Sequence, residues 1–471
     1  MRKLVVIFLT LMILGLSTFA VSAQGPDAYE STVTVTNASD VAGTINLVFY
    51  NPDGSIADDS INDPIGPYET KFYTTFPVAK GFEGSMIIQS SVPLATSSTI
   101  IGKSRNNPIN YASYVGVSGG TGSVYLPLLM DENFGFNTFF SVQNTSTNPV
   151  DISIEYSDGL VVSDITNLQP GAAVIIDNQS EGHPEPKFSA SLTATGGDIA
   201  VAVVEWSYGK YGKSLFSYNG FASNQGTPNP VIPMVNQNNY GFWTSIPIQN
   251  IGDQDTTVTL TYTPTKAGTA CTETLSIPAG GWAEFGSYAH VFSPKSAGST
   301  CKLKELFVGA AVVTENSNNQ PLIGLMNQST TLRNNYEKAG ALMTMNPDLA
   351  TTKVIFPESY QWFGGYKWWS SITLVNVSGG TLPAGDIVCR GIGHSGSNPV
   401  DITWSNPNPI PDGEGFITDL FNNYGPLPNG FIGGIICDAS GDILGTLNNL
   451  GHVAPNTLDS YTLFEGINIA P

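Results

Sequence analysis

An alternating strand that ends in asparagine occurs four times in this chain, and it decides the fold. The four copies are Ser31-Thr-Val-Thr-Val-Thr-Asn37, Phe139-Phe-Ser-Val-Gln-Asn144, Thr244-Ser-Ile-Pro-Ile-Gln-Asn250 and Ser371-Ile-Thr-Leu-Val-Asn376. The asparagines lie 107, 106 and 126 residues apart. Alternation with a period of two is typical of strands that bury one face. A chain of 471 residues is too long for one core, so these intervals predict tandem β units.

Further landmarks follow each asparagine in the same order. A proline-containing turn comes first, at Pro67, Pro170, Pro278 and Pro411. A phenylalanine followed by small residues comes next, at Phe82, Phe188, Phe307 and Phe431. A tyrosine closes each unit, at Tyr114, Tyr218, Tyr336 and Tyr461. Self-similarity of this kind is the signature of a repeat architecture.

We therefore predict an all-β protein made of four tandem β-sandwich repeats. Their ranges are 24–123 (repeat 1), 124–229 (repeat 2), 230–352 (repeat 3) and 353–471 (repeat 4). Short alternating strands separated by turn residues such as Asp-Gly and Pro indicate two packed sheets in each repeat. The pattern resembles the immunoglobulin-like and fibronectin-like repeat arrays of bacterial secreted and surface proteins. The Cys-Trp-Cys core of true immunoglobulin domains is absent, so the strand order stays open.

The first 23 residues have the layout of a cleaved secretory signal. Arg2 and Lys3 precede an apolar stretch, and Val21-Ser22-Ala23 supplies small residues for cleavage. No later apolar run reaches the roughly 18 residues that span a bilayer. We expect a secreted protein, extracellular or on the cell surface, without membrane insertion.

The charge balance excludes one class of partner. Without the signal, 16 Lys and Arg stand against 38 Asp and Glu, a net charge of −22. Such a surface repels nucleic acid, so we expect no nucleic-acid partner.

The four cysteines lie in repeats 3 and 4. Export and an even number favour disulfides, and four cysteines allow three pairings. Pairing within each repeat is the simplest, which joins Cys271 to Cys301 and Cys389 to Cys437. We expect the second bond to link the two sheets of repeat 4, and the first to pin an insertion before Phe307.

We identify no catalytic or cofactor site and predict that the protein is not an enzyme. The histidines form no metal-binding motif, and Gly116-Val-Ser-Gly-Gly120 lies in a link between repeats, where we expect a flexible connector. Acidic loops at Asp58-Asp59 and Gly252-Asp-Gln-Asp255 leave loop calcium open as an alternative to solvated turns.

Three of the repeated asparagines, Asn37, Asn144 and Asn376, also belong to N-x-Ser sequons. They are candidate glycosylation sites. The alternative is that each side chain caps a turn.

The densest group of aromatic residues lies between positions 360 and 369. Trp362, Tyr366 and Trp369 are candidates for stacking on sugar rings of surface glycans. Core or interface packing is the competing interpretation.

The two ends of the chain complement each other. Short apolar segments that end in proline precede repeats 2, 3 and 4, at Val124–Pro127, Pro230–Pro233 and Val354–Pro357, whereas mature repeat 1 has none. The chain finishes with a similar segment, residues 466–471, whose Ile467, Ile469 and Pro471 resemble the first strand of a fifth repeat. This strand could fill the empty position in another copy, as in the donor-strand exchange of pilins.

The favoured function is a secreted structural or adhesive protein. We expect a subunit of an extracellular filament, sheath or surface layer, a homopolymer assembled head-to-tail by β-strand addition. The alternative is a secreted carbohydrate-binding protein that uses the aromatic cluster.

Overall fold

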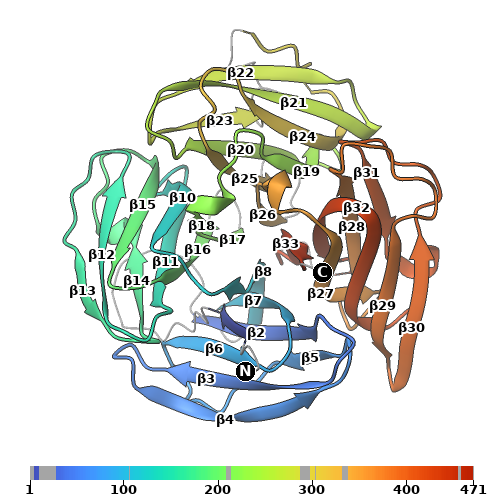
Figure 1. Ribbon diagram of the computed structural model, residues 1–471, viewed down its shortest axis with the longest axis horizontal. Helices are drawn as coiled ribbons and strands as arrows, with labels where there is room; N and C mark the ends of the chain where they lie inside the picture. The colour runs from blue at the N-terminus through green and yellow to red at the C-terminus, as the bar shows by residue number, and fades with distance from the viewer. Residues whose placement is uncertain are drawn as a thin grey trace. The chain divides into compact units, whose positions relative to one another are not determined.

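A computed structural model describes residues 5–9, 28–104, 107–207, 214–286, 298–302, 304–330, 338–453 and 458–469. Within these ranges the regular structure consists of antiparallel strands and four short 3₁₀ helices, η1 (Asn178–Ser180), η2 (Ser223–Gln225), η3 (Pro347–Leu349) and η4 (Asn422–Tyr424). The predicted all-β class is confirmed (Figure 1). Among the described residues, no helix is long and apolar enough to cross a membrane.

The chain divides into two compact units. The first comprises Met1–Ala222 together with Thr457–Thr462, and the second comprises Ser223–Asn456 together with Leu463–Pro471. Repeats 1 and 2 therefore lie in the first unit. Repeats 3 and 4 lie in the second unit, apart from a short C-terminal segment.

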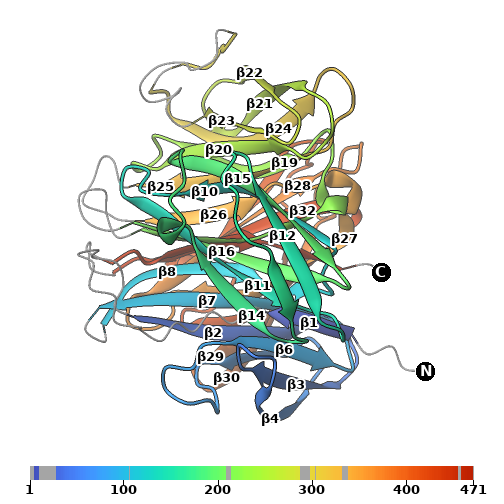
Figure 2. The ribbon, with the colours of Figure 1, turned by 90° about the vertical axis from the view of Figure 1, so that its left-hand side faces the viewer.

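Repeat 1 is a sandwich of two antiparallel sheets, seen as two layers in Figures 1 and 2. One sheet has the order β4 (Ile56–Ile65), β3 (Gly43–Tyr50), β6 (Ser85–Ser90), β1 (Val5–Leu9) and β9 (Val117–Ser118). The other has the order β5 (Thr70–Tyr73), β2 (Ala28–Asn37), β7 (Leu94–Ser104) and β8 (Asn107–Val115).

Repeat 2 has the same strand order. Its first sheet is β13 (Ile165–Leu168), β12 (Val150–Tyr156), β15 (Lys187–Thr195), β10 (Ser123–Met130) and β18 (Phe221–Ala222). Its second sheet is β14 (Ala173–Asp177), β11 (Phe136–Asn144), β16 (Ile199–Ser207) and β17 (Leu215–Asn219).

Repeat 3 keeps this order in two four-stranded sheets. The first is β22 (Cys271–Ile277), β21 (Thr256–Ala267), β24 (Phe307–Glu315) and β19 (Val231–Gln237). The second is β23 (Trp282–Gly286), β20 (Trp243–Asn250), β25 (Leu322–Ser329) and β26 (Ala339–Met343).

Repeat 4 differs because one long strand, β32 (Phe431–Gly451), belongs to both layers. In one layer the order is β30 (Asn398–Ser405), β29 (Val388–Ser395), β32, β27 (Thr351–Gln361) and β34 (Ile467–Asn468). In the other layer, β32 pairs with β28 (Trp368–Asn376), which pairs with β31 (Gly415–Asp419). Strand β33 (Tyr461–Glu465) also pairs with β32.

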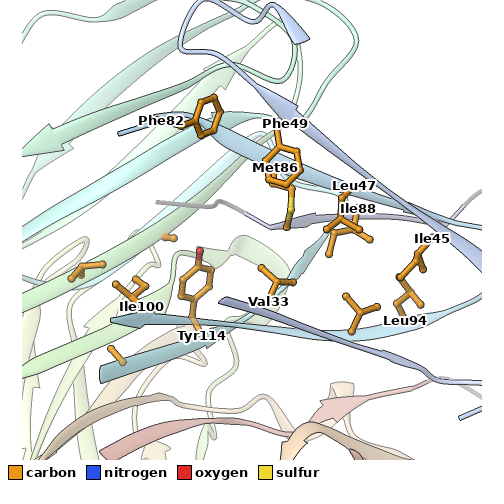
Figure 3. Close-up of a cluster of buried hydrophobic side chains, with 14 of the residues drawn as sticks. Val33, Ile45, Leu47, Phe49, Phe82, Met86, Ile88, Leu94, Ile100 and Tyr114 are labelled. Carbon is orange, nitrogen blue, oxygen red and sulfur yellow. The ribbon is translucent and has the colours of Figure 1, made fainter. Parts of the chain in front are cut away.

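The core of repeat 1 forms where the inward faces of its sheets meet (Figure 3). Phe49 and Met86 come from one sheet, and Val33, Ile100 and Tyr114 come from the other; all five are at most 2% exposed. Burial of each such side chain stabilises the fold by about 1.5–3 kcal/mol. Alternation therefore does place the apolar side chains between the sheets.

The four repeated asparagines each close the same pair of loops. Every one is fully buried. In each repeat the side-chain amide donates to the carbonyl four residues ahead, which belongs to Val41, Asn148, Gln254 or Gly380, at 2.6–2.8 Å. The amide also donates to a carbonyl at the proline-containing turn, which belongs to Gly66, Leu168, Pro278 or Ile410, at 2.8–3.2 Å.

The carboxamide oxygen is used as well. It accepts from the backbone N–H two residues ahead, at Ser39, Ser146, Gly252 and Ser378, at 2.8–3.0 Å. We call this arrangement the asparagine clasp. It is the turn-capping alternative of the sequence analysis, and in the folded chain Nδ2 of Asn37, Asn144 and Asn376 donates to two carbonyls.

Removal of one clasp should destabilise its repeat. We expect Asn144→Ala to lower the free energy of unfolding by about 2–5 kcal/mol, because the carbonyls of Asn148 and Leu168 lose their donor. Asn144→Asp, which keeps the shape but cannot donate, should cost a similar amount. Urea unfolding measures both. Asn148→Ala, four residues away with an exposed side chain, is the control; equal stability of all three variants would contradict the role of the clasp.

Candidate functional site

The first strand of each repeat lies in an equivalent position, and in repeats 1, 2 and 4 it has another strand on either side. Strand β10 lies between β15 and β18, and β27 lies between β32 and β34. In repeat 3, β19 pairs with β24, and Val231 forms a bridge with Met345 on its other edge. These strands occupy what we call the strand slot.

In repeat 1 the strand slot holds β1, which belongs to the predicted signal. Val5–Leu9 pairs with Ser90–Met86 of β6 in five register positions, and Ile7 and Phe8 pair with Ser118 and Val117 of β9. The slot that mature repeat 1 was expected to leave empty is therefore occupied by residues of the predicted signal. The predicted cleavage site after Ala23 lies outside the described residues.

A proline marks the slot strand in the other repeats. The register shifts between Leu126 and Leu129 in β10, between Ile232 and Val235 in β19, and between Phe356 and Ser359 in β27. Each shift contains the predicted proline, at Pro127, Pro233 and Pro357. Proline is tolerated at such a bulge because it cannot donate to the ladder. Strand β1 has no proline and pairs with β6 without a shift.

The C-terminal strand lies in its own repeat. Ile467 and Asn468 of β34 pair with Ile355 and Val354 of β27, and the Ile469 N–H donates to the Lys353 carbonyl at 3.1 Å. In a single chain, β34 thus takes the position in repeat 4 that β9 and β18 take in repeats 1 and 2. Pro471 lies outside the described residues.

The link after repeat 1 is also part of a sheet. Val117 and Ser118, inside the GxSxG-like sequence, form β9. The prediction of a flexible connector is therefore wrong for Val117 and Ser118, because their backbone pairs with β1.

Both predicted disulfides are present. Cys271 is bonded to Cys301 and Cys389 to Cys437. The first ties the segment before β24 to β22. The second does not join two sheets as expected, because Cys389 and Cys437 are direct partners on the neighbouring strands β29 and β32, with Cα atoms 4.0 Å apart. The register of these two strands could not be read from the alternation alone.

Two of the three predicted glycan-stacking residues, Trp362 and Trp369, pack into a ring cluster at the loops of repeat 4. The centroids of Trp362 and Trp369 each lie 5.2 Å from that of Phe421, with the rings edge to face. His452 lies 4.9 Å from Trp362. Both tryptophans and Tyr366 are half-buried, so these rings do not form an open row. Tyr424, which is 87% exposed and nearly parallel to Phe421, extends the cluster into solvent.

A buried histidine in repeat 2 forms a clasp that the sequence analysis missed. His183 has a fully buried side chain whose Nδ1 lies 2.9 Å from Asp158 and whose Nε2 lies 3.2 Å from Glu181. The ring stacks on Phe188 at 3.7 Å, and Tyr156 donates to Glu181 at 2.9 Å. Asp158 and Glu181 lie 25 and 2 residues from His183 in the sequence, so no short sequence motif indicates this arrangement. The clasp ties two loops together.

Two opposing effects set the pKa of His183. Burial alone would lower it, but the hydrogen bonds and charges of Glu181 and Asp158 outweigh burial and raise the pKa above 6.5. The imidazolium is therefore the form that this clasp favours.

The loop carboxylates considered for calcium make turn contacts. Asp58 accepts from the N–H and hydroxyl of Ser60 at 2.9 and 2.7 Å, and Asp255 accepts from the N–H of Ala279 at 3.0 Å. Within the described part of the chain, no three His, Cys, Asp or Glu side chains gather into a metal-binding group.

The histidine clasp predicts a pH dependence. A raised pKa in the folded state adds stability that is complete below the unfolded pKa and is lost as the pH rises through the folded one. We expect His183→Gln to lower the free energy of unfolding by about 2–3 kcal/mol at pH 6 and by less at pH 8. Urea unfolding at both values measures this. His394→Gln, at an exposed position, is the control; an equal loss for His183→Gln at both pH values would contradict the charged clasp.

Comparisons with known proteins leave the family open. No family model matches the chain, and no curated protein matches it. Among solved structures, it is similar to a tetra-tandem repeat in the extending region of a large adhesion protein, at 12% identity over 99% of both chains with a TM-score of 0.11. It is also similar to the BSP domain of a biofilm-associated protein, at 7% identity over 98% of this chain and 97% of that one with a TM-score of 0.14. TM-scores this low carry no argument about fold or function.

Proposed function

We propose that this protein is an exported structural or adhesive component of an extracellular surface that assembles with further copies by β-strand addition. The observation that carries the proposal is the strand slot of repeat 1, where the strand between β6 and β9 comes from leader residues Val5–Leu9. Removal of residues 1–23 would take this strand away and expose the backbone groups of both neighbours. Exposed edges of this kind are templates for a strand from another chain.

The C-terminal strand of a second copy is the donor that fits the slot. Ile467 and Ile469 alternate around Asn468, so both can face the apolar interior of a sandwich. In its own repeat, β34 has one strand neighbour, β27, with two register pairs, and its side chains are half-buried. In the slot it would have two neighbours. Each backbone hydrogen bond added in the slot would contribute about 1 kcal/mol net toward the exchange.

Such a contact joins unlike surfaces of two copies. Each copy would offer one donor strand and one slot, so association continues without closing unless the geometry forms a ring.

The interior of each sandwich meanwhile supports a structural role. In repeat 3, for example, buried Glu273 accepts from the Tyr262 hydroxyl at 3.0 Å and from the Gly286 N–H at 2.9 Å.

Carbohydrate binding by the ring cluster is the second candidate function. Tyr424 and the half-buried Trp362 and Trp369 could contact a surface glycan at the loops of repeat 4. Their mutual packing on Phe421 supports a structural role for most of the cluster.

Deletion of residues 466–471 should abolish assembly of the mature chain, residues 24–471. We expect light scattering and negative-stain microscopy to show long particles for the mature chain and monomers for the deletion. Thermal unfolding checks that repeat 4 remains folded. Long particles from the deleted chain would contradict the donor assignment.

A peptide experiment tests the slot separately. A synthetic peptide with the sequence Val5–Leu9 between lysines should bind the mature chain and shorten its particles, because it fills the slot. The same peptide with proline in place of Ile7 is the control, since it cannot complete the ladder. Equal effects of the two peptides would exclude a strand slot.

A further inference from the structure

The C-terminal strand β34 is held in its own repeat from two sides. Toward β27 it has the register pairs and the Ile469 hydrogen bond described above. Toward β32, the Gly466 N–H donates to the Gly445 carbonyl at 2.7 Å, and the Asn468 amide donates to the Ile443 carbonyl at 2.9 Å. Release of β34 breaks all of these bonds before the strand can pair with another copy.

Gly466 lets the chain cross the apolar face of β27. It is buried, and a Cβ atom built on it would lie 2.3 Å from Cγ1 of Val354 and 2.8 Å from Cε1 of Phe356. Both neighbours are fully buried core residues, so the close-packed interior has no room into which they could move. The position of β34 in repeat 4 therefore requires glycine at 466.

Glu465, the last residue of β33, connects the start of this segment to repeat 3. Met343 is the last residue of β26, which is an edge strand of its sheet and is buried along its whole length. The Met343 N–H donates to Oε1 of Glu465. A buried edge strand has outward N–H groups that no further strand can satisfy, and this carboxyl satisfies one of them. The contact lies within the second compact unit.

Burial governs the charge of Glu465. It raises the pKa of this carboxyl to about 7, although hydrogen bonds from the Met343 N–H and from its own N–H act to lower it. Strand β26 carries no ionisable side chain. The ionisable side chains on β27, on β32 and elsewhere on β33 are Lys353, Glu358, Tyr360, Asp438, Asp442 and Tyr461. Of these, Lys353 and Asp438 form an ion pair at 3.4 Å.

We propose that Glu465, Gly466 and Asn468 form a latch that keeps the donor strand in its own repeat and delays assembly until β34 is released. The proposal rests on the donor role of β34 in the proposed function. A strand that was free from the start would pair with any open sheet edge that it met. The latch is thus an autoinhibitory contact, because the backbone groups that it holds are those that would pair in the strand slot.

The buried carboxyl makes the latch sensitive to pH. In a released segment, Glu465 would lie in water with its ordinary pKa of 4.5. The latched form therefore keeps a proton that the released form loses. Release becomes more favourable as the pH rises from about 4.5 to about 7, and it changes little above that range. The latch is tight in acid and weaker at neutral and alkaline pH.

Hydrogen exchange measures release without assembly. The amides of residues 466–469 are followed by mass spectrometry in the mature chain at pH 5 and pH 8, at a concentration too low for particles to form. Each exchange rate is divided by that of Glu465→Gln in the same buffer. We expect the ratio to rise roughly fiftyfold to a hundredfold between the two pH values, because the variant keeps the acceptor but has no proton to lose. Glu414→Gln, at an exposed position of repeat 4, is the matched control and should behave as the parent does.

Gly466→Ala opens the latch without changing its charge. The added methyl group overlaps Val354 and Phe356, so we expect release to increase about tenfold or more at both pH values. Light scattering should show particles of this variant growing faster than those of the parent. Gly365→Ala is the matched control, since a Cβ atom at this exposed position of repeat 4 has no atom within 4 Å. Thermal unfolding checks that repeat 4 stays folded.

Two results would overturn the latch. One is an exchange ratio that is the same at pH 5 and pH 8. The other is growth of the Gly466→Ala particles no faster than that of the parent, with repeat 4 folded in both. If Gly466→Ala unfolds repeat 4, the exchange ratio decides alone.

Failure of the proposed function would give a different result. The exchange ratio would rise with pH, but neither the parent nor Gly466→Ala would form particles at pH 5 or pH 8. Strand β34 would then be released as the latch requires, and it would not be a donor.

Discussion

One buried carboxamide in each repeat holds two loops that the strands alone would leave apart. The asparagine clasp supplies two donors and one acceptor from a single buried side chain, at 2.6–3.2 Å. It joins the loop that follows the strand to the proline-containing turn farther along the chain. The asparagine is thus the residue on which the repeat pattern depends.

Much of the architecture could be predicted because it rests on local patterns. Alternation of apolar residues predicted the strands, and the recurrent asparagine predicted the repeats. The positions of the cysteines within repeats predicted both disulfide pairings. What failed depended on register or on distant contacts. Cys389 and Cys437 face each other across two neighbouring strands. His183 finds Asp158 across a loop.

The strand slot shows how a single position accepts different sequences. Strands β10 and β27 each have a proline at a bulge in this position, whereas β1 has neither a proline nor a bulge. The position specifies an extended backbone with apolar side chains on one face more than it specifies a sequence. A slot with this tolerance suits a site that is filled by one segment at one stage and by another later.

Repeat 4 differs from the others in a way that affects its response to mechanical force. In repeats 1 to 3 the strands equivalent to β32 are separate, as β6 and β7 are, with a turn between the layers. In repeat 4 one strand of 21 residues runs through both layers, and Cys437 near its start is bonded to Cys389 on the neighbouring strand. A pull along this strand is carried from one layer to the other by covalent bonds. The two sheets of repeat 4 cannot shear apart without unzipping a strand that both share.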